Sequence, residues 1–264
     1  MRISIIRGKA MDSRKSAADK WGKRFLAAVF WILVWQLASM WLKQEILLAS
    51  PVSVIKRLGQ LVITLDFWKS IGFSFCRIVL GFFLGLGLGT GLAVLSYAFS
   101  VAEILLEPLI AVVKSTPVAS FTILCLIWIP SRNLSVFISF LMAFPVVYTN
   151  LLEGLRQTDS QLLEMADSFG AGMGKKIEFV YLSQLLPYFA TACSLGLGLC
   201  WKAGVAAEVI GIPTGSIGEK LYKAKIYLNT PDLFAWTIVI ILISVSFEKL
   251  FMAILQGIMR RVEC

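Results

Sequence analysis

Long apolar runs, separated by short polar segments, set the pattern of the whole chain. Each run has about eighteen residues or more, and a helix of that length, at roughly 1.5 Å per residue, spans about 27 Å of a bilayer core. Six such runs cover residues 25–42, 71–97, 104–129, 134–152, 188–210 and 233–259. The pattern predicts an all-α, polytopic integral membrane protein with about six transmembrane helices.

Two segments between these runs predict shorter helices. Residues 48–65 mix apolar positions at helical spacing with basic residues, which is typical of an amphipathic helix at a membrane surface. Residues 217–227 predict a short helix in an external loop. The first apolar run is too long for the core of a cleavable signal peptide, and the Ala-Ser-Pro at residues 49–51 is a poor cleavage site. We therefore expect an uncleaved anchor.

Glycines and prolines distinguish the second and third runs. The glycines of the second run are Gly81, Gly85, Gly87, Gly89 and Gly91. Small residues four apart let two helix backbones approach closely in lipid, so we expect this helix inside the bundle. The third run contains Pro108 and Pro117 and should bend or break. Glu103, Glu107 and Lys114 fall on one stripe of its helix because they lie four and seven residues apart.

Composition agrees with a membrane protein and argues against other classes. Of the 264 residues, 58% are hydrophobic. There is no histidine, which removes the usual zinc ligand and the usual general base, and the five cysteines show no paired metal spacing. We predict neither a metal site nor a catalytic residue.

Basic residues are concentrated at the start of the chain, whose formal charge is +9. Residues 1–24 contain eight Lys or Arg against two Asp. Because segments rich in Lys and Arg stay on the inner side of a membrane, this tail predicts cytoplasmic termini at both ends of a six-span chain. We expect the lipid bilayer, not nucleic acid, as the environment of the basic residues.

The polar segment 158–187 lies between the fourth and fifth runs and predicts two short helices joined by a glycine break. Thr158 and Gln161 have the spacing of a capping box, so a helix can start near Asp159. Glycines at 170, 172 and 174 then interrupt the pattern, and a second helical pattern follows over residues 175–186. A charged helical element of this kind is costly to keep between spans unless another protein docks on it.

This segment resembles the signature loop of binding-protein-dependent ABC importer permeases. The family pattern is Glu-Ala-Ala, three residues, Gly, nine residues, then Ile-x-Leu-Pro. Here Glu164-Met165-Ala166 is followed at the same spacing by Gly170 and by Val180-Tyr181-Leu182-Ser183. Ser183 stands where the family has proline and departs from the pattern.

Other residues resemble the nitrate/sulfonate/taurine branch of the same family. The match runs from Ser74 onward and covers about three quarters of the chain. The residues that carry it are Ser74, Arg77, Gly81, Phe82, Glu107, Pro108, Thr116, Pro117, Glu153, Gly154, Leu155, Arg156, Trp201, Lys202, Ala207 and Glu208.

The resemblance implies a type I ABC importer-like permease fold in the bacterial cytoplasmic membrane. Residues 1–24 would form a basic cytoplasmic tail and residues 25–264 the transmembrane domain, with 158–187 as its coupling loop. The implied partners are two ATP-binding cassette ATPase subunits, a second permease copy (most simply in a homodimer) and an extracytoplasmic solute-binding protein. The implied solute is a small anion such as a sulfonate, taurine or nitrate.

The chain itself is not expected to hydrolyse ATP. Its nearest likeness to a phosphate-binding loop ends at Gly174-Lys175, with Phe169 in place of the first glycine and Lys176 in place of Ser or Thr. ATP and Mg²⁺ would be bound by the partner ATPase, and this chain would hold no cofactor. The alternatives are a secondary transporter driven by an ion gradient and, less consistent with the missing catalytic groups, a membrane-embedded enzyme.

The resemblance and the charge pattern give two sets of candidate residues. The residues expected to couple to the ATPase are Glu164, Ala166, Asp167, Gly170, Ala171 and Lys175. The candidates for the translocation path are Arg77, Lys114, Thr116, Lys202 and Glu208. For each path candidate, a buried ion pair or a snorkelling side chain that holds the bundle together is an equal alternative. Lys202 and Glu208 lie six apart and should not pair within one helix.

Overall fold

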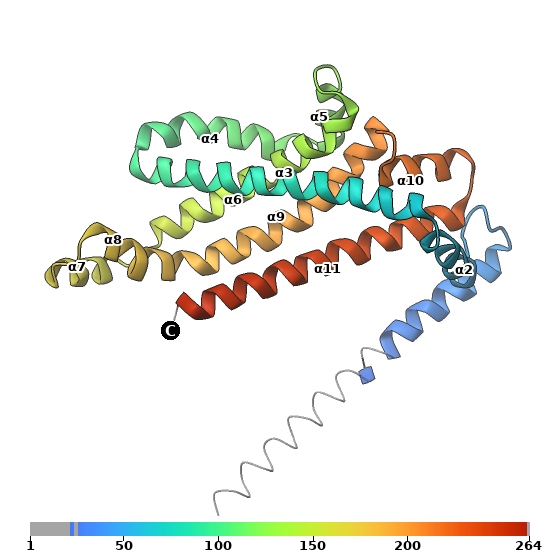
Figure 1. Ribbon diagram of the computed structural model, residues 1–264, viewed down its shortest axis with the longest axis horizontal. Coiled ribbons are helices and arrows are strands. Elements are labelled where there is room, and N and C mark those ends of the chain that lie inside the picture. The colour runs from blue at the N-terminus through green and yellow to red at the C-terminus, as the bar shows by residue number, and fades with distance from the viewer. Residues whose placement is uncertain (1–21, 24–25, 263–264) are drawn as a thin grey trace, which may run out of the picture. The chain divides into compact units, whose positions relative to one another are not determined.

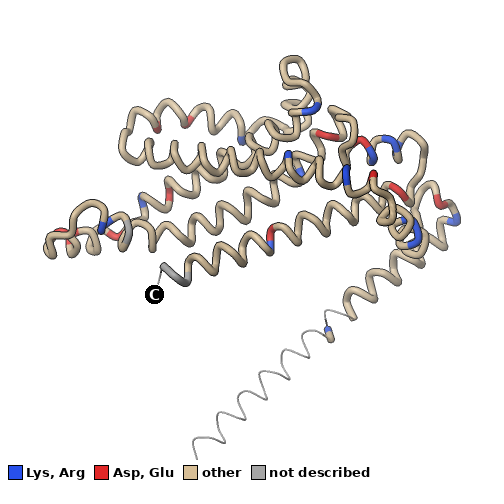
Figure 2. The backbone as a smooth tube through the Cα atoms, in the orientation of Figure 1, with Lys and Arg blue, Asp and Glu red and all other residues tan. Residues whose placement is uncertain are grey.

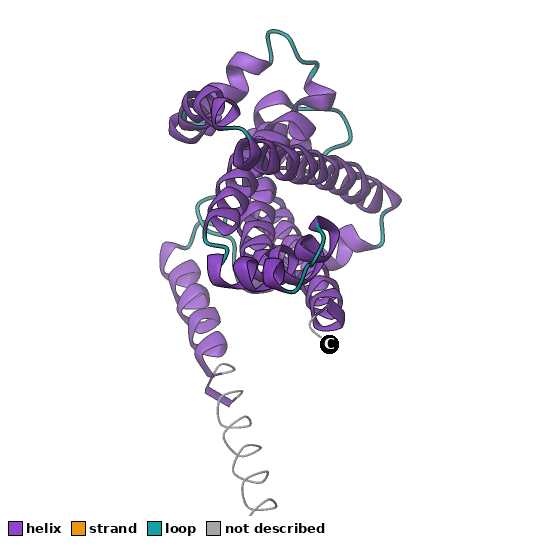
Figure 3. Ribbon diagram, turned by 90° about the vertical axis from the view of Figure 1, so that its left-hand side faces the viewer, coloured by secondary structure: helices purple, strands orange, loops and turns teal. Residues whose placement is uncertain are grey.

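The computed structural model describes residues 22–23 and 26–262, and this part of the chain consists of helices joined by loops, without a strand (Figure 3). The predicted all-α class is confirmed. Most of the predicted basic tail, and residue 25 of the first predicted span, lie outside the described residues.

Most helices fall close to the predicted segments (Figure 1). After an unlabelled helix over Leu26–Leu42, the elements are α2 (Pro51–Val62), α3 (Leu65–Ala98), α4 (Ser100–Ser115), α5 (Val118–Cys125), α6 (Ser131–Arg156), α7 (Ser160–Ser168), α8 (Met173–Lys176), the π-helical turn η1 (Ile177–Tyr181), α9 (Leu182–Gly211), α10 (Ile217–Ile226) and α11 (Thr230–Val262).

Four helical stretches among the described residues are long and apolar enough to cross a membrane. They are Leu65–Ala98, Ser131–Arg156, Met173–Gly211 and Thr230–Met259. The bent pair α4 and α5 raises the number to five, and Leu26–Leu42 is a shorter apolar helix. The prediction of about six spans therefore depends on counting both the broken pair and this shorter helix.

The predicted break in the third span occurs at its second proline. Helices α4 and α5 meet at 104° across the Thr116-Pro117 junction. Pro108 stays inside α4 without ending it. The two prolines differ because the residue before Pro117 has an extended backbone, with ψ of 128°, as the steric clash with a following proline favours.

The chain divides into two compact units. Among the described residues, the smaller comprises 22–23, 26–61 and 224–235. Within it, the Trp35 indole donates to the Ala49 carbonyl (3.0 Å) and the Ser39 hydroxyl to the Leu48 carbonyl (3.0 Å), which fastens the helix Leu26–Leu42 to the loop before α2. Arg57 of α2 forms an ion pair with Asp232.

The larger unit, with the described residues 62–223 and 236–262, has its core where α3, α6 and α9 pack together (Figure 1). Glycines on one face of α3 permit its contact with α6: a Cβ on Gly81 would lie 2.3 Å from the Val136 carbonyl oxygen, and one on Gly85 would lie 2.6 Å from the Ala143 Cβ. The predicted close packing of this helix is confirmed. Of the five glycines, Gly87 and Gly91 face open space and take no part in it.

Charged residues are sparse along these core helices (Figure 2). The stretch of α3 after Arg77 has none, and α9 has only Lys202 and Glu208. Such uncharged stretches match a hydrocarbon environment, so the few charges inside the spans identify sites of special interest.

Candidate functional site

The polar segment after α6 forms a short helix, α7, whose first turn is capped by its own sequence. The Asp159 carboxylate accepts the N–H of Gln161 at 2.8 Å, so Asp159 is the N-cap. The prediction that Thr158 caps this helix is wrong. The Thr158 hydroxyl donates instead to the Gly154 carbonyl (3.4 Å), because Thr158 follows directly on the last turn of α6. The start near Asp159 is as predicted.

Gly170 ends α7 in a left-handed turn with φ of +66°. Its N–H donates to the Asp167 carbonyl, and the next N–H, of Ala171, donates to the Ala166 carbonyl, each at 2.9 Å. These two bonds form a Schellman motif, which satisfies the last carbonyls of the helix and favours glycine at the left-handed position. Four of the six residues expected to couple to the ATPase thus build one turn.

An ion pair and a hydrogen bond hold this element together. Asp167 of α7 pairs with Lys176 of α8. The Gln184 amide oxygen accepts the Asp159 N–H at 2.9 Å, which links the start of α7 to α9. The second predicted helix of the segment is not separate: α8 continues through η1 into α9, and Pro187 lies inside the helix. Ser183 keeps the N–H that a proline would lack, and the helix runs on.

The segment projects beyond one end of the core helices (Figure 1). Neither α7 nor α8 has a buried residue. Met165, Phe169 and Met173 are 53%, 83% and 69% exposed, although large apolar side chains usually find cover. Glu164 and Lys175 are also exposed, and neither forms an ion pair with a described residue. The element thus has internal contacts of its own and presents an uncovered apolar surface.

The structure separates the five path candidates. Arg77 donates to the Arg132 carbonyl and places its guanidinium 3.8 Å from the centroid of the Phe73 ring. The Thr116 hydroxyl bonds to the Val112 carbonyl (2.7 Å) at the junction of α4 and α5. Lys202 is exposed on α9 and makes no ion pair with a described residue.

Glu208 lies fully buried on α9 and does not pair with Lys202, as expected from their spacing. Its Oε2 accepts the Ser74 hydroxyl (2.6 Å) and the Gly218 N–H (3.3 Å). Ser74 in turn accepts the Ile217 N–H at 2.9 Å. A Cβ on Gly218 would lie 2.3 Å from the Glu208 Cβ, so only glycine fits there. Glu208 thus accepts a hydrogen bond from the first turn of α10, and its carboxylate stabilises the positive end of that helix.

A local capping pair completes the start of α10. The Ser216 hydroxyl accepts the Glu219 N–H (3.0 Å), and the Glu219 carboxylate accepts the Gly215 N–H (2.6 Å) and pairs with Lys223 (2.6 Å). Burial raises the pKa of the Glu219 carboxyl, but these hydrogen bonds lower it by more, so its pKa lies below the ordinary value. Ser74, Glu208 and Ser216 thus accept the first three N–H groups of α10, so each of these groups has a side-chain acceptor.

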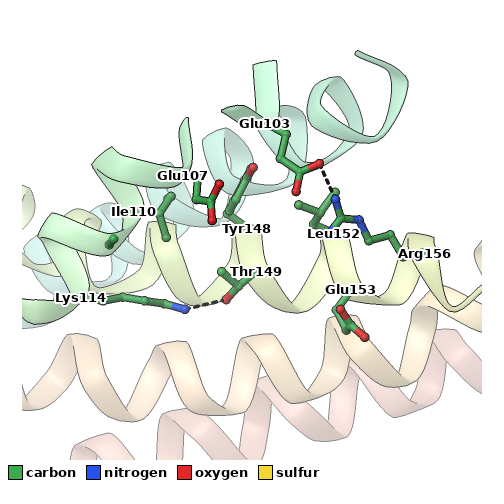
Figure 4. Close-up of a pocket in the computed structure, with 10 residues that line it drawn as sticks. Glu103, Glu107, Ile110, Lys114, Tyr148, Thr149, Leu152, Glu153 and Arg156 are labelled. Carbon is green, nitrogen blue, oxygen red and sulfur yellow. Dashed lines mark hydrogen bonds and ion pairs between the residues drawn. The ribbon is translucent and has the colours of Figure 1, made fainter. Parts of the chain in front are cut away.

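A pocket of about 330 Å³ lies between α4 and α6 (Figure 4). Ten residues line it, namely Glu103, Glu107, Ile110, Ala111 and Lys114 from α4 and Tyr148, Thr149, Leu152, Glu153 and Arg156 from α6. Of the path candidates only Lys114 lines this pocket. The other charged residues were missed as site residues, although the stripe of Glu103, Glu107 and Lys114 was apparent from spacing. The residues at 148, 152 and 156 repeat every fourth position, which is the matching signal on α6.

Residues 78–263, more than half of the chain, match the family described as "Binding-protein-dependent transport system inner membrane component". The chain belongs to this family.

Individual relatives extend the match toward the N-terminus. The chain is 27% identical to the putative aliphatic sulfonates transport permease protein SsuC of Bacillus subtilis (strain 168), over 89% of its own length and 87% of that protein. It is 24% identical to a probable ABC transporter permease protein of Brucella melitensis biotype 1, covering 79% and 85% respectively. It is 26% identical to the taurine transport system permease protein TauC of Escherichia coli (strain K12), covering 84% and 82%.

Family membership resolves the alternatives left open by the sequence. The protein is a multi-pass membrane permease subunit of an ATP-driven importer, not a secondary transporter and not an enzyme. Importers of this family work with an ATPase and with a solute-binding protein.

Proposed function

We propose that α7 and α8 form the coupling element of the permease, which docks on a separate ATPase subunit on the cytoplasmic side. The observation that carries this proposal is the exposed apolar surface of Met165, Phe169 and Met173 on a segment without a buried residue. Glu164 and Lys175 add charge to the same element, where polar contacts would fix the register of docking.

The contacts within the element suit it to transmit a movement of the ATPase to the helices of the permease. The Schellman turn at Gly170 and the Asp167–Lys176 pair keep α7 in a fixed orientation to α8. Because α8 continues through η1 into α9, a displacement of α7 reaches a core helix without passing through a flexible loop. The switch would be a rigid-body motion of the kind common in gated transporters.

Two ATPase subunits and two permease copies make up the proposed assembly. ATP and Mg²⁺ bind to the ATPase subunits, and this chain holds neither. Lys202 supports a second permease copy: it is exposed on the apolar helix α9, and an ammonium group facing lipid is costly. In a homodimer, α9 would face the second permease copy or a water-filled path, and the Lys202 ammonium group would be kept from lipid. The termini and α7–α8 lie in the cytoplasm, and residues 25–264 act as one transmembrane domain.

The proposed solute is a small anion or anion-bearing compound, delivered by an extracytoplasmic binding protein. The names of two relatives, which refer to aliphatic sulfonates and taurine, support a sulfonate-type solute. Lys114 in the pocket and Lys202 on α9 are proposed cations of the path, together with Thr116 at the α4–α5 junction and Arg77, which bonds to the Arg132 carbonyl at the start of α6. For Glu208, the fifth path candidate, we propose a role in holding α10 in place, which its burial and its bonds to Ser74 and Gly218 support.

A pair of substitutions at Gly170 tests the coupling role. Gly170→Pro cannot adopt φ of +66° and loses the N–H that bonds to Asp167, so it breaks the turn. Gly170→Asn tolerates the left-handed region and is the matched control. We expect both variants in the membrane at parental levels. Binding-protein-stimulated ATP hydrolysis and uptake in proteoliposomes should be lost in Gly170→Pro and kept in Gly170→Asn. Normal uptake by Gly170→Pro would refute the proposal.

A further inference from the structure

The pocket between α4 and α6 contains two charged groups of opposite sign that lack an ion partner. Glu107 forms no hydrogen bond or ion pair with any described residue. The Lys114 ammonium donates to the Thr149 hydroxyl at 3.3 Å and has no carboxylate partner in the described chain. Both side chains line the same pocket, and both come from α4 (Figure 4).

The other charges of the pocket already have partners. Glu103 pairs with Arg156, which joins α4 to α6 at one end of the pocket. The Glu153 carboxylate accepts the Gln157 amide at 2.7 Å. Glu107 and Lys114 are therefore the two oppositely charged groups of α4 without an ion partner, and Glu153 of α6 adds a second carboxylate whose charge is not neutralised.

Their position within a span makes solvent or a solute the expected neighbour. Helix α4 belongs to the broken span, and ionisable side chains at membrane depth face a cavity, a partner or a substrate because exposure to hydrocarbon is costly. The pocket provides such a cavity. Its volume of about 330 Å³ accommodates a small organic molecule together with several waters, since one water occupies about 30 Å³.

The spacing of the two groups sets the size of what can bridge them. Seven residues of helix correspond to about 10 Å along the axis. Side chains on a helix lean toward its N-terminus, so the long Lys114 side chain reaches back toward Glu107 and shortens that separation. Ile110 and Ala111 form the apolar wall between the two charges, suited to a short methylene chain.

The sum of charges argues against a solute that is only an anion. When the Glu103–Arg156 pair is set aside, the lining retains Glu107 and Glu153 against Lys114 alone. An anion attracted to Lys114 is repelled by the carboxylates beside it. A molecule with an ammonium group at its other end satisfies both signs at once.

We propose that this pocket binds a small zwitterion, with its ammonium group on the Glu107 carboxylate and its anionic group on the Lys114 ammonium and the Thr149 hydroxyl. This inference rests on the proposed function, because it treats the pocket as part of the solute path. It narrows the solute class from small anions to compounds that carry both charges, and it adds Glu107 as a specificity-determining residue.

Two compounds of equal size provide the test. Taurine (2-aminoethanesulfonate) and isethionate (2-hydroxyethanesulfonate) differ in that an ammonium group replaces a hydroxyl group, and β-alanine tests the carboxylate analogue. Each is titrated into the purified permease–ATPase complex without the solute-binding protein, and the thermal unfolding midpoint is followed. A ligand that binds only the folded state stabilises it by RT ln(1 + [L]/Kd), so the rise of the midpoint with concentration reports the apparent affinity. We expect a rise with taurine or β-alanine and a response to isethionate at least about tenfold weaker in apparent affinity.

Variants that remove or keep each charge test whether the preference for a zwitterion comes from the pocket. Glu107→Gln should lose the preference for the zwitterion over isethionate, and Lys114→Met should lose binding of both. Glu107→Asp and Lys114→Arg should retain the preference. Glu45→Gln and Lys249→Met remove exposed charges that do not line the pocket, and they should behave as the parent.

Three results would overturn the proposal: no response to either zwitterion, an equal response to isethionate, or an unchanged preference in Glu107→Gln. The proposed function is checked separately through ATP hydrolysis stimulated by the solute-binding protein in the parent complex. If that hydrolysis is present while the zwitterion preference is absent, the further inference fails and the coupling role remains.

Discussion

At the scale of single residues, the projecting element depends on backbone geometry more than on side-chain packing. Gly170 adopts the left-handed turn, and nothing lies within 4 Å of the place where a Cβ would stand. Its role is therefore conformational, which the sequence alone predicted from the glycine break. The N-cap was not predicted correctly because Asp159 and Thr158 are adjacent and both can cap a helix. Only the end of α6 decides between them.

The capping carboxylate of α10 gives a prediction about acid stability. The pKa of Glu219 is depressed in the folded protein, so its ionised form stabilises the fold at pH values above the ordinary pKa of about 4.5. That contribution is lost as the pH falls through the depressed folded value. Glu219→Gln has no such ionisation, and we expect its thermal midpoint to be lower than the parent's near pH 7 and the difference to shrink at acid pH.

Measurement of the midpoint of both proteins in detergent from pH 7 down to pH 3 checks this expectation. Asp167→Asn serves as a control, because it removes an exposed carboxylate in α7 and leaves the Glu219 cap intact. A gap between parent and Glu219→Gln that stays constant or widens toward acid pH would show that the carboxylate does not act in its ionised form.

At the scale of elements, the contact of α3 with α6 is the clearest success of the sequence pattern. The pattern of small residues indicated close packing but not which of the five glycines carry it. The structure assigns the contact to the face with Gly81, Gly85 and Gly89, while Gly87 and Gly91 point to open space. The partner helix could not be predicted, because a small-residue face fits any neighbour that approaches closely.

This asymmetry supplies a matched pair of substitutions. Gly85→Leu forces a side chain against Ala143 and the Phe140 carbonyl, whereas Gly87→Leu meets no atom within 4 Å. Overpacking a well-packed contact costs about 1–3 kcal/mol or more. We expect Gly85→Leu to lower the thermal midpoint and the amount of protein in the membrane, with Gly87→Leu close to the parent. Equal behaviour of the two variants would contradict the assigned contact.

The prolines show that the sequence does not predict which proline breaks a helix. Pro117 breaks a span as expected, but Pro108, Pro145 and Pro187 all lie inside helices. A lost hydrogen bond bends a helix only if neighbouring contacts permit it, and those contacts are tertiary. For the same reason, the continuous path from α8 through η1 to α9 was predicted as two separate helices.

At the scale of the whole molecule, the charges within the spans separate into buried, paired and uncovered groups. Glu208 is buried and holds α10, Glu103 is paired with Arg156, and Lys202 is uncovered on an apolar helix. The sequence placed Lys202 and Glu208 within a span and Glu103 and Arg156 just outside the spans, but it could not tell these environments apart, because each depends on a neighbouring helix. The pocket between α4 and α6 likewise required two helices to be placed side by side.

Lys202 provides a prediction for the assembled transporter. Lys202→Met keeps the length of the side chain and removes its charge, so we expect normal insertion with uptake reduced by about tenfold or more if the group lines the solute path. Lys249→Met, an exposed lysine of α11, is the control. Initial uptake rates in proteoliposomes with the complete complex provide the measurement. Parental uptake by Lys202→Met would remove this residue from the path.

The most direct test of the coupling role asks from which side α7 is reached and what covers it. Phe169, 83% exposed, is replaced by cysteine in a chain whose five native cysteines are removed, and a membrane-impermeant maleimide is applied to right-side-out and inside-out vesicles. A cytoplasmic coupling element predicts labelling in inside-out vesicles alone, and protection when the ATPase subunits are bound. Labelling from the external side, or labelling that bound ATPase does not slow, would contradict it.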